Sequence, residues 1–219
     1  LMAAHDATPR LRVARIVQFC GFDSIPMDSG ALLLNHESQR GVGDYCFAIV
    51  MVVNALKGGA SGGTMASIMN VMREARADKE VARVLARPYS LNPVGELRGP
   101  DRGDQRAIRF DDDAGSWTAP FIMATVNTRV VRRSHALLGY PWGDSFRYHE
   151  AIQTGSGVGG WSRSAMITAG LTGLVGAASF GWSRGLLERF VLPRPGTGPG
   201  AAAREKGFFN LEQIGRLAD

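Results

Sequence analysis

The sequence is poor in the residues that bind metals. Its 219 residues include only two cysteines, Cys20 and Cys46, and four histidines that are scattered along the chain. No Cys-x-x-Cys pair or other metal-ligand spacing occurs, so we expect no metal at the functional site. Each cysteine stands in an apolar run. We therefore expect two buried free thiols in a protein of a reducing compartment, the cytoplasm.

Two further absences concern partners and targeting. The net charge is +5 and the pI is near 9.7, yet the chain has no basic stripe with interleaved aromatic residues and no nucleic-acid-binding module. We therefore expect no nucleic-acid partner. We also expect no secretory signal at the beginning of the sequence, because charged and polar residues interrupt its apolar runs.

A strand, a tight turn and a helix are indicated near the start of the chain. Residues 13–20 form an apolar run rich in β-branched side chains, and Gly21 follows them. Pro26 suits the first turn of a helix, while Asp23 or Ser24 can cap its free N–H groups. In α/β proteins ligands usually bind at such a turn, where a strand ends.

The residues of this turn carry a family resemblance. Cys-Gly-Phe-Asp-Ser-Ile-Pro at residues 20–26, with Asp28 and Gly30, resembles the signature of the saccharopine dehydrogenase-like oxidoreductases, in the branch of the trans-acting enoyl reductases. Other segments resemble the same branch in the same order and span nearly the whole chain. They are residues 61–67, 87–93, 119–124, 127–134 and 196–199.

The resemblance implies an α/β fold and an oxidoreductase. Residues 1–36 would be the end of a Rossmann-type dinucleotide-binding domain, and residues 37–219 a mixed-sheet catalytic or dimerisation domain with flanking helices. The family's Gly-rich phosphate turn precedes the signature, so we expect it to lie outside this chain, along with part of the C-terminal sheet. The activity implied is transfer of a hydride from NAD or NADP to the unsaturated bond of a lipid-like acyl substrate. We expect this chain alone to be inactive and to bind a dinucleotide poorly.

The same resemblance suggests residues for the site. Gly21, Phe22 and Asp23 would contact the cofactor, and Asp23 and Ser24 the substrate. A catalytic proton donor cannot be assigned from the sequence. Two further groups would also hold the substrate, namely Ser61-Gly62-Gly63-Thr64 and the cluster Arg129, Arg132 and Arg133.

Each of these two groups has a simpler interpretation. Ser61-Gly62-Gly63-Thr64 opens a predicted helix and can cradle an oxygen with its N–H groups, or it can be a plain helix cap. The arginine cluster can pair with a carboxylate, thioester or phosphate of a ligand, or it can be a solvated face or an interdomain salt-bridge patch. The sequence leaves both alternatives open.

Hydrophobic patterns predict further elements. The continuous apolar run at residues 45–53 is typical of a strand covered on both faces, central in its sheet. Residues 145–154 indicate an amphipathic strand. Residues 117–138 suggest a long helix, capped by Thr118 and with Pro120 in its first turn. The three acids of residues 111–113 indicate a solvated turn.

The least usual stretch is residues 164–183, which carry no charge and contain several glycines. Three interpretations stay open in this order: a buried or homodimer-interface helix, a helix lying on a membrane surface, and a spanning helix. A membrane contact of this kind suggests an alternative function. The chain would then be a non-catalytic, membrane- or lipid-associated protein that keeps the fold without a cofactor site.

Overall fold

The computed structural model describes most of the chain beyond residue 20. The described residues are 21–22, 24–59, 61–93, 95, 99–190, 193–194 and 196–218. Cys20, Asp23 and the strand expected at residues 13–20 lie outside them. The Rossmann-type assignment and the division of the chain at residue 36 therefore stay predictions, as does the pairing of Asp23 with cofactor or substrate.

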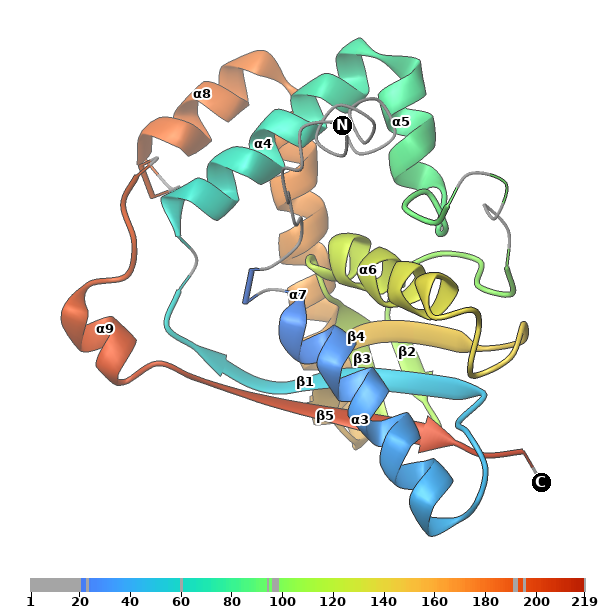
Figure 1. Ribbon diagram of the computed structural model, residues 1–219. Coiled ribbons are helices and arrows are strands. Elements are labelled where there is room, and N and C mark those ends of the chain that lie inside the picture. Colours follow the sequence, from blue (N-terminus) through green and yellow to red (C-terminus); the bar gives the residue numbers. More distant parts are fainter. Residues whose placement is uncertain are drawn as a thin grey trace.

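Helices and strands alternate along the described chain (Figure 1). The helices are α3 (Ile25–Gly41), α4 (Gly62–Ala77), α5 (Lys79–Ala86), α6 (Ala124–Leu137), α7 (Gly157–Ser179), α8 (Gly181–Phe190) and α9 (Ala201–Glu205). The strands are β1 (Ala48–Lys57), β2 (Arg109–Asp111), β3 (Ser116–Pro120), β4 (Arg147–Gly155) and β5 (Phe208–Arg216).

The strands form one mixed sheet in the order β2-β3-β4-β1-β5. β1 and β4 are parallel, with Ile49 opposite Tyr148, and the other neighbouring pairs are antiparallel. β1 lies inside the sheet between β4 and β5, and its residues 49–53 are all buried. Because successive side chains of a strand point to opposite faces, both faces are covered along this stretch. The α/β class, the mixed sheet and this inner strand were predicted correctly.

Helices α3 and α6 cover one face of the sheet and pack against each other (Figure 1). Their apolar side chains meet those of β1 and β4 in the main core. The buried members of this core are Met27, Ala31, Cys46, Ile49, Met51, Val53, Val131, Trp142, Phe146 and Tyr148. Cys46 is a buried free thiol, as expected. This face of the sheet therefore carries both the core and the start of α3, where the signature lies.

The helix predicted for residues 117–138 is wrong over its first part. Residues 116–120 form strand β3, which pairs with β2 and β4, and α6 begins only at Ala124. The Thr118 hydroxyl donates to the carbonyl of Arg109 at 3.0 Å instead of capping a helix. Pro120 is the last residue of its strand, a position that its missing N–H permits. Hydrogen bonding of β3 to both β2 and β4 outweighs the preference of Thr118 and Pro120 for the start of a helix.

The acidic run at residues 111–113 is only partly a solvated turn. Asp111 ends β2 and is buried, with its Oδ2 3.2 Å from His149 Nε2. This hydrogen bond holds the pKa of Asp111 below its ordinary value. Asp113 forms an ion pair with Arg216 of β5. Asp111 pairs with Ser116 in the β2–β3 hairpin, and only residues 112–115 form the turn.

The uncharged stretch becomes α7 and the beginning of α8, with a break at Phe180. Only Gly160, Ser164 and Ala178 of α7 are buried, whereas Met166 is 72% exposed. In Figure 1, α7 leaves the sheet and runs toward α4 and α8. Within this chain α7 is therefore not a buried helix. No helix among the described residues is both long enough and apolar enough to cross a bilayer. A dimer interface and contact with a membrane surface stay predictions.

Candidate functional site

The start of α3 holds the first element of the site, Ser24. This residue precedes α3, yet its side chain caps no N–H group of the helix. Its backbone already has helical angles, φ −108° and ψ −26°, whereas a capping residue normally has an extended backbone. The hydroxyl donates instead to Asn127 Oδ1 of α6 at 3.0 Å, and both residues are buried. Ser24 is therefore not the cap, and its side chain ties α3 to α6; Asp23, the other candidate, lies outside the described residues.

Asn127 continues this contact to a buried acid on β4. Its Nδ2 donates to Glu150 Oε2 at 3.1 Å, and the Tyr148 hydroxyl donates to Glu150 Oε1 at 3.0 Å. Glu150 is 1% exposed, and burial raises its pKa from 4.5 to about 7. Burial also raises the pKa of Tyr148 well above its ordinary value. We name Ser24, Asn127, Glu150 and Tyr148 the polar chain.

Other signature residues hold α3 in place. Asp28 accepts a hydrogen bond from the Ser134 hydroxyl of α6 at 2.8 Å. Gly30 faces the Gln213 side chain of β5, and a Cβ there would lie only 2.4 Å from its Nε2. A larger residue at position 30 would therefore displace the Gln213 side chain. Gly21 accepts weak hydrogen bonds from the first turn, and the Phe22 ring meets Phe209 edge-on with centroids 4.6 Å apart.

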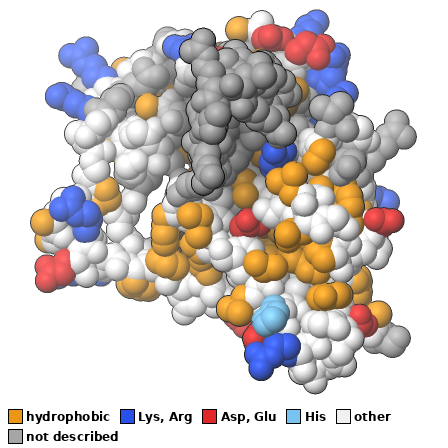
Figure 2. All heavy atoms as spheres, in the orientation of Figure 1, with side chains coloured by type: hydrophobic (Ala, Val, Ile, Leu, Met, Phe, Trp, Pro, Cys, Tyr) orange, Lys and Arg blue, Asp and Glu red, His pale blue; other side chains and the backbone are white. Residues whose placement is uncertain are grey.

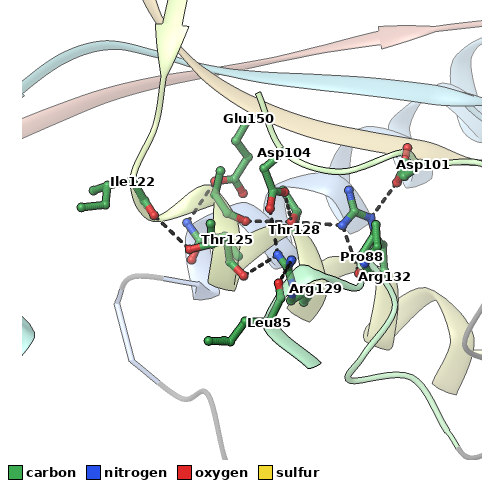
Figure 3. A network of polar contacts seen from close by, with 12 residues as sticks. Leu85, Pro88, Asp101, Asp104, Ile122, Thr125, Thr128, Arg129, Arg132 and Glu150 are labelled. Carbon is green, nitrogen blue, oxygen red and sulfur yellow. Dashed lines mark hydrogen bonds and ion pairs between the residues drawn. The ribbon is translucent and has the colours of Figure 1, made fainter. Parts of the chain in front are cut away.

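The arginine cluster lies on α6, but its guanidinium groups bind protein. Arg129 pairs with Asp104 at 2.9 Å, and Arg132 pairs with Asp101 at 2.6 Å (Figure 3). Both arginines are almost fully buried. Arg133 donates to the carbonyl of Leu91. The cluster therefore fastens Leu91, Asp101 and Asp104 to α6 as an internal salt-bridge patch.

Arg132 has the most contacts of the three. It donates to the carbonyl of Pro88 at 3.1 Å (Figure 3). It also donates to the carbonyl of Tyr148 at 2.9 Å and stacks over the Tyr89 ring. Burial raises the pKa of Tyr89 to about 12. In Arg129 the buried Nε has no hydrogen-bond partner. A ligand anion would have to replace these protein acceptors, so ligand contact by the cluster stays a prediction.

Ser61-Gly62-Gly63-Thr64 begins α4, where the chain itself binds the helix end. The Ser61 hydroxyl accepts from the Thr64 N–H at 3.1 Å, which is a helix cap. The Gly62 N–H donates to the carbonyl of Thr197 at 2.8 Å. A Cβ on Gly62 would lie 1.8 Å from the Arg194 oxygen, so the loop before α9 lies directly on this turn. The cap interpretation is confirmed, and the oxygen cradle stays a prediction.

The segments that carry the resemblance meet in two places. The signature, residues 87–93 and residues 127–134 come together around α6, through Ser24, Tyr89 and Arg132. Ser61–Thr64 and residues 196–199 meet at the start of α4. Among the described residues, no hydrogen bond joins the start of α4 to the polar chain. The sequence therefore named residues of two separate clusters as one site.

Sequence analysis gave no role to Glu150 and missed Tyr148, Asp101 and Asp104. The signal for Glu150 was that an acidic residue stands inside the strand predicted for residues 145–154. Glu150 faces Asn127, and its neighbour His149 faces Asp111. Their opposite directions agree with the period of a strand. The two aspartates stand in an irregular segment, where no period indicates which way a side chain points.

A metal ion and a dinucleotide are the two ligands whose requirements can be compared with the described residues. They contain no cluster of three or more histidine, cysteine, aspartate or glutamate side chains that could hold a metal. A dinucleotide would need a Gly-rich turn with free N–H groups at a helix end. The Gly-rich turn before α4 instead bonds Ser61 and Thr197, and thus does not fit a pyrophosphate as it stands.

Comparison with known proteins finds relatives that are named trans-acting enoyl reductases, and three of them represent the range of identity. The chain is 43% identical over 213 residues to a Mycobacterium tuberculosis protein provisionally named a trans-acting enoyl reductase, and the match covers 91% of this chain and 49% of that protein. It is 36% identical over 210 residues to the trans-acting enoyl reductase of Mycobacterium ulcerans, with 91% and 50% covered. It is 33% identical over 216 residues to that of Mycobacterium bovis, with the same coverage.

The chain thus spans about half the length of the curated relatives it matches. No family model matches it, and no solved structure is detectably similar. The predicted resemblance to trans-acting enoyl reductases is confirmed. The names of these relatives give no support to the alternative of a non-catalytic lipid-associated protein.

Proposed function

We propose that this chain forms the substrate side of an enoyl reductase. The observation that carries the proposal is the 43% identity over 91% of the chain to a protein provisionally named a trans-acting enoyl reductase. The signature and the segments at residues 87–93 and 127–134 also pack together around α6. The proposal includes kinship with the wider saccharopine dehydrogenase-like oxidoreductases, which rests on the sequence motifs alone.

An apolar surface beside the polar chain supports an acyl substrate. Phe22 is 60% exposed, and Ile25 and Phe209 next to it are also exposed. Hydrophobic side chains gather on the face in Figure 2, in the area where Figure 1 draws α3 and β5. Exposed aromatic and aliphatic groups at a strand-to-helix turn suit the hydrocarbon part of a lipid-like substrate. We name Phe22, Ile25 and Phe209 the apolar wall.

The proposed reaction saturates a carbon–carbon double bond conjugated to a carbonyl. NAD or NADP, when bound, would supply the hydride for one carbon, and a proton would complete the other. This chain would contribute the apolar wall and the start of α3, with Gly21 and Phe22 at the nicotinamide end. Because the Gly-rich turn before α4 is bonded to Ser61 and Thr197, we expect the phosphates to be held away from that turn. A homodimer and peripheral membrane contact remain part of the proposal.

Titration calorimetry tests the proposal with a 2-enoyl thioester and with NADH and NADPH. The samples are this chain and the longest protein that its gene encodes. We expect both samples to bind the thioester, and Phe22→Asp to weaken that binding at least tenfold. Val84→Asp is the matched control, since Val84 is an exposed apolar residue on α5, away from the apolar wall. Failure of both samples to bind the thioester would overturn the proposal.

A further inference from the structure

Glu150 is a buried acid whose hydrogen-bond partners are both neutral. Within the described part of the chain, no lysine, arginine or histidine forms an ion pair with it, because Arg129 and Arg132 pair with Asp104 and Asp101. Its two oxygens accept only from the neutral donors Asn127 and Tyr148. A buried carboxylate with neutral partners is costly, and protonation is the usual relief.

Asn127 can respond to that proton. With Glu150 ionised, Asn127 Nδ2 donates to the acid, and its Oδ1 accepts from the Ser24 hydroxyl. With a proton on Oε2, the Glu150 carboxyl becomes a donor. The Asn127 side-chain amide, flipped so that its oxygen and nitrogen exchange places, then presents Oδ1 as the acceptor. Nδ2 then donates to Ser24 Oγ. The Ser24 hydroxyl no longer donates to Asn127, and its own proton is free for another acceptor.

We infer that Glu150 is a positioning residue, which by gaining or losing a proton turns the Asn127 amide and thereby sets the direction of the Ser24 hydroxyl at the start of α3. One proton moves between solvent and the carboxyl, and no covalent bond forms or breaks. Ser24 would donate outward from the polar chain only in the protonated state. The inference goes beyond the proposed reduction and holds whether or not the chain binds an enoyl group.

The charges around Glu150 favour titration in the neutral range. Burial raises the pKa of Glu150 most, the carboxylate of Asp104 raises it further, and the Arg132 guanidinium on α6 lowers it. Tyr148 on the same strand is its titratable hydrogen-bond partner, and Asp28 on α3 raises the pKa of that tyrosine. Burial raises the pKa of Asp28 too. One acid, Asp104, and one arginine, Arg132, thus act on a group that has only neutral hydrogen-bond partners.

NMR titration of the isotope-labelled chain between pH 5 and pH 9 tests the inference. We expect the Glu150 carboxyl carbon and the Asn127 side-chain amide to shift together, with one midpoint. In Glu150→Gln, which keeps the shape but cannot ionise, the Asn127 shift should be lost. Glu212→Gln is the matched control, because Glu212 is an exposed acid on β5 bonded to an asparagine, Asn54. It should leave the Asn127 shift unchanged.

Two results would overturn the inference. One is a Glu150 carboxyl that titrates in the range of exposed glutamates. The other is a Glu150 that titrates while Asn127 stays unchanged, since the proton would then be shared with Tyr148 alone. Both results are read from the unmodified chain, so they hold even if Glu150→Gln fails to fold. Calorimetry with the enoyl thioester is independent of them, and failure of the proposed function is therefore distinguishable.

Discussion

Helices α6 and α7 each follow a strand of the same sheet. The more polar helix, α6, is the more buried of the two, and the more apolar helix, α7, is largely exposed. Nine residues of α6 are buried, among them Asn127, Arg129 and Arg132. Only three residues of the longer and more apolar α7 are buried. The difference lies in partners, because acids, carbonyls and a serine from elsewhere in the chain satisfy the polar groups of α6. Buried polar groups are tolerated when they are hydrogen-bonded.

The largest effect is expected from Arg132→Met on α6. The change leaves Asp101 buried without its cation and removes the hydrogen bonds to Pro88 and Tyr148. Breaking one side of a buried ion pair costs about 3–5 kcal/mol. Urea unfolding measures this cost, with Arg147→Met, an exposed arginine of β4, as the control. A cost below about 1 kcal/mol would contradict the account of a helix held inside by its charge partners.

Glu150→Gln should change stability in a pH-dependent manner. A carboxyl whose pKa rises from 4.5 to about 7 on folding takes up protons in the native state. Its stabilising effect is complete below pH 4.5 and is lost as the pH rises through 7, a loss of about 3 kcal/mol. The glutamine variant should therefore be similar to the parent at pH 5 and more stable by up to about 3 kcal/mol at pH 8. Urea unfolding at both values tests this, and equal differences at the two pH values would refute it.

Ser24→Ala should cost about 2 kcal/mol, since it leaves Asn127 Oδ1 buried without a donor. Thermal and urea unfolding give the value. Ser162→Ala on α7 is the control, because that serine is exposed and bonds only the Gly159 carbonyl. If both variants lost the same stability, the contact between α3 and α6 would not depend on this hydroxyl.

Met166→Gln on α7 should change the stability of the monomer by less than about 0.5 kcal/mol, because this side chain is largely exposed. Unfolding at low protein concentration checks the value. Light scattering of the same variant sharpens the comparison. A large destabilisation that appears only at high concentration would place Met166 in a contact between copies of the chain.

Patterns that depend on neighbouring residues were readable from the sequence, and distant partners were not. The inner strand β1 follows from its continuous apolar run, and α3 from Pro26 and the turn before it. Strand β3 was missed because Thr118 and Pro120 also suit a helix start, and only its pairing with β2 and β4 decides.

The same limit applies to the site. Ser24 was named from the sequence as a substrate contact, which stays a prediction, and its partner Asn127, 103 residues away, was not foreseen. The arginines of α6 were recognised as a cluster, while their acids lie in an irregular segment at residues 101–104. Sequence patterns therefore located both polar groups without showing that the chain itself binds them.

The most direct test of the proposed function measures the transfer of deuterium from the nicotinamide cofactor to the substrate. The longest protein that the gene encodes is incubated with a 2-enoyl thioester and nicotinamide cofactor deuterated at the hydride position, and the product is examined by mass spectrometry. We predict a saturated thioester that carries one deuterium, with less of it formed by Phe22→Asp and an unchanged amount by Val84→Asp. An unreduced thioester with both cofactors would contradict the assignment of this chain to an enoyl reductase.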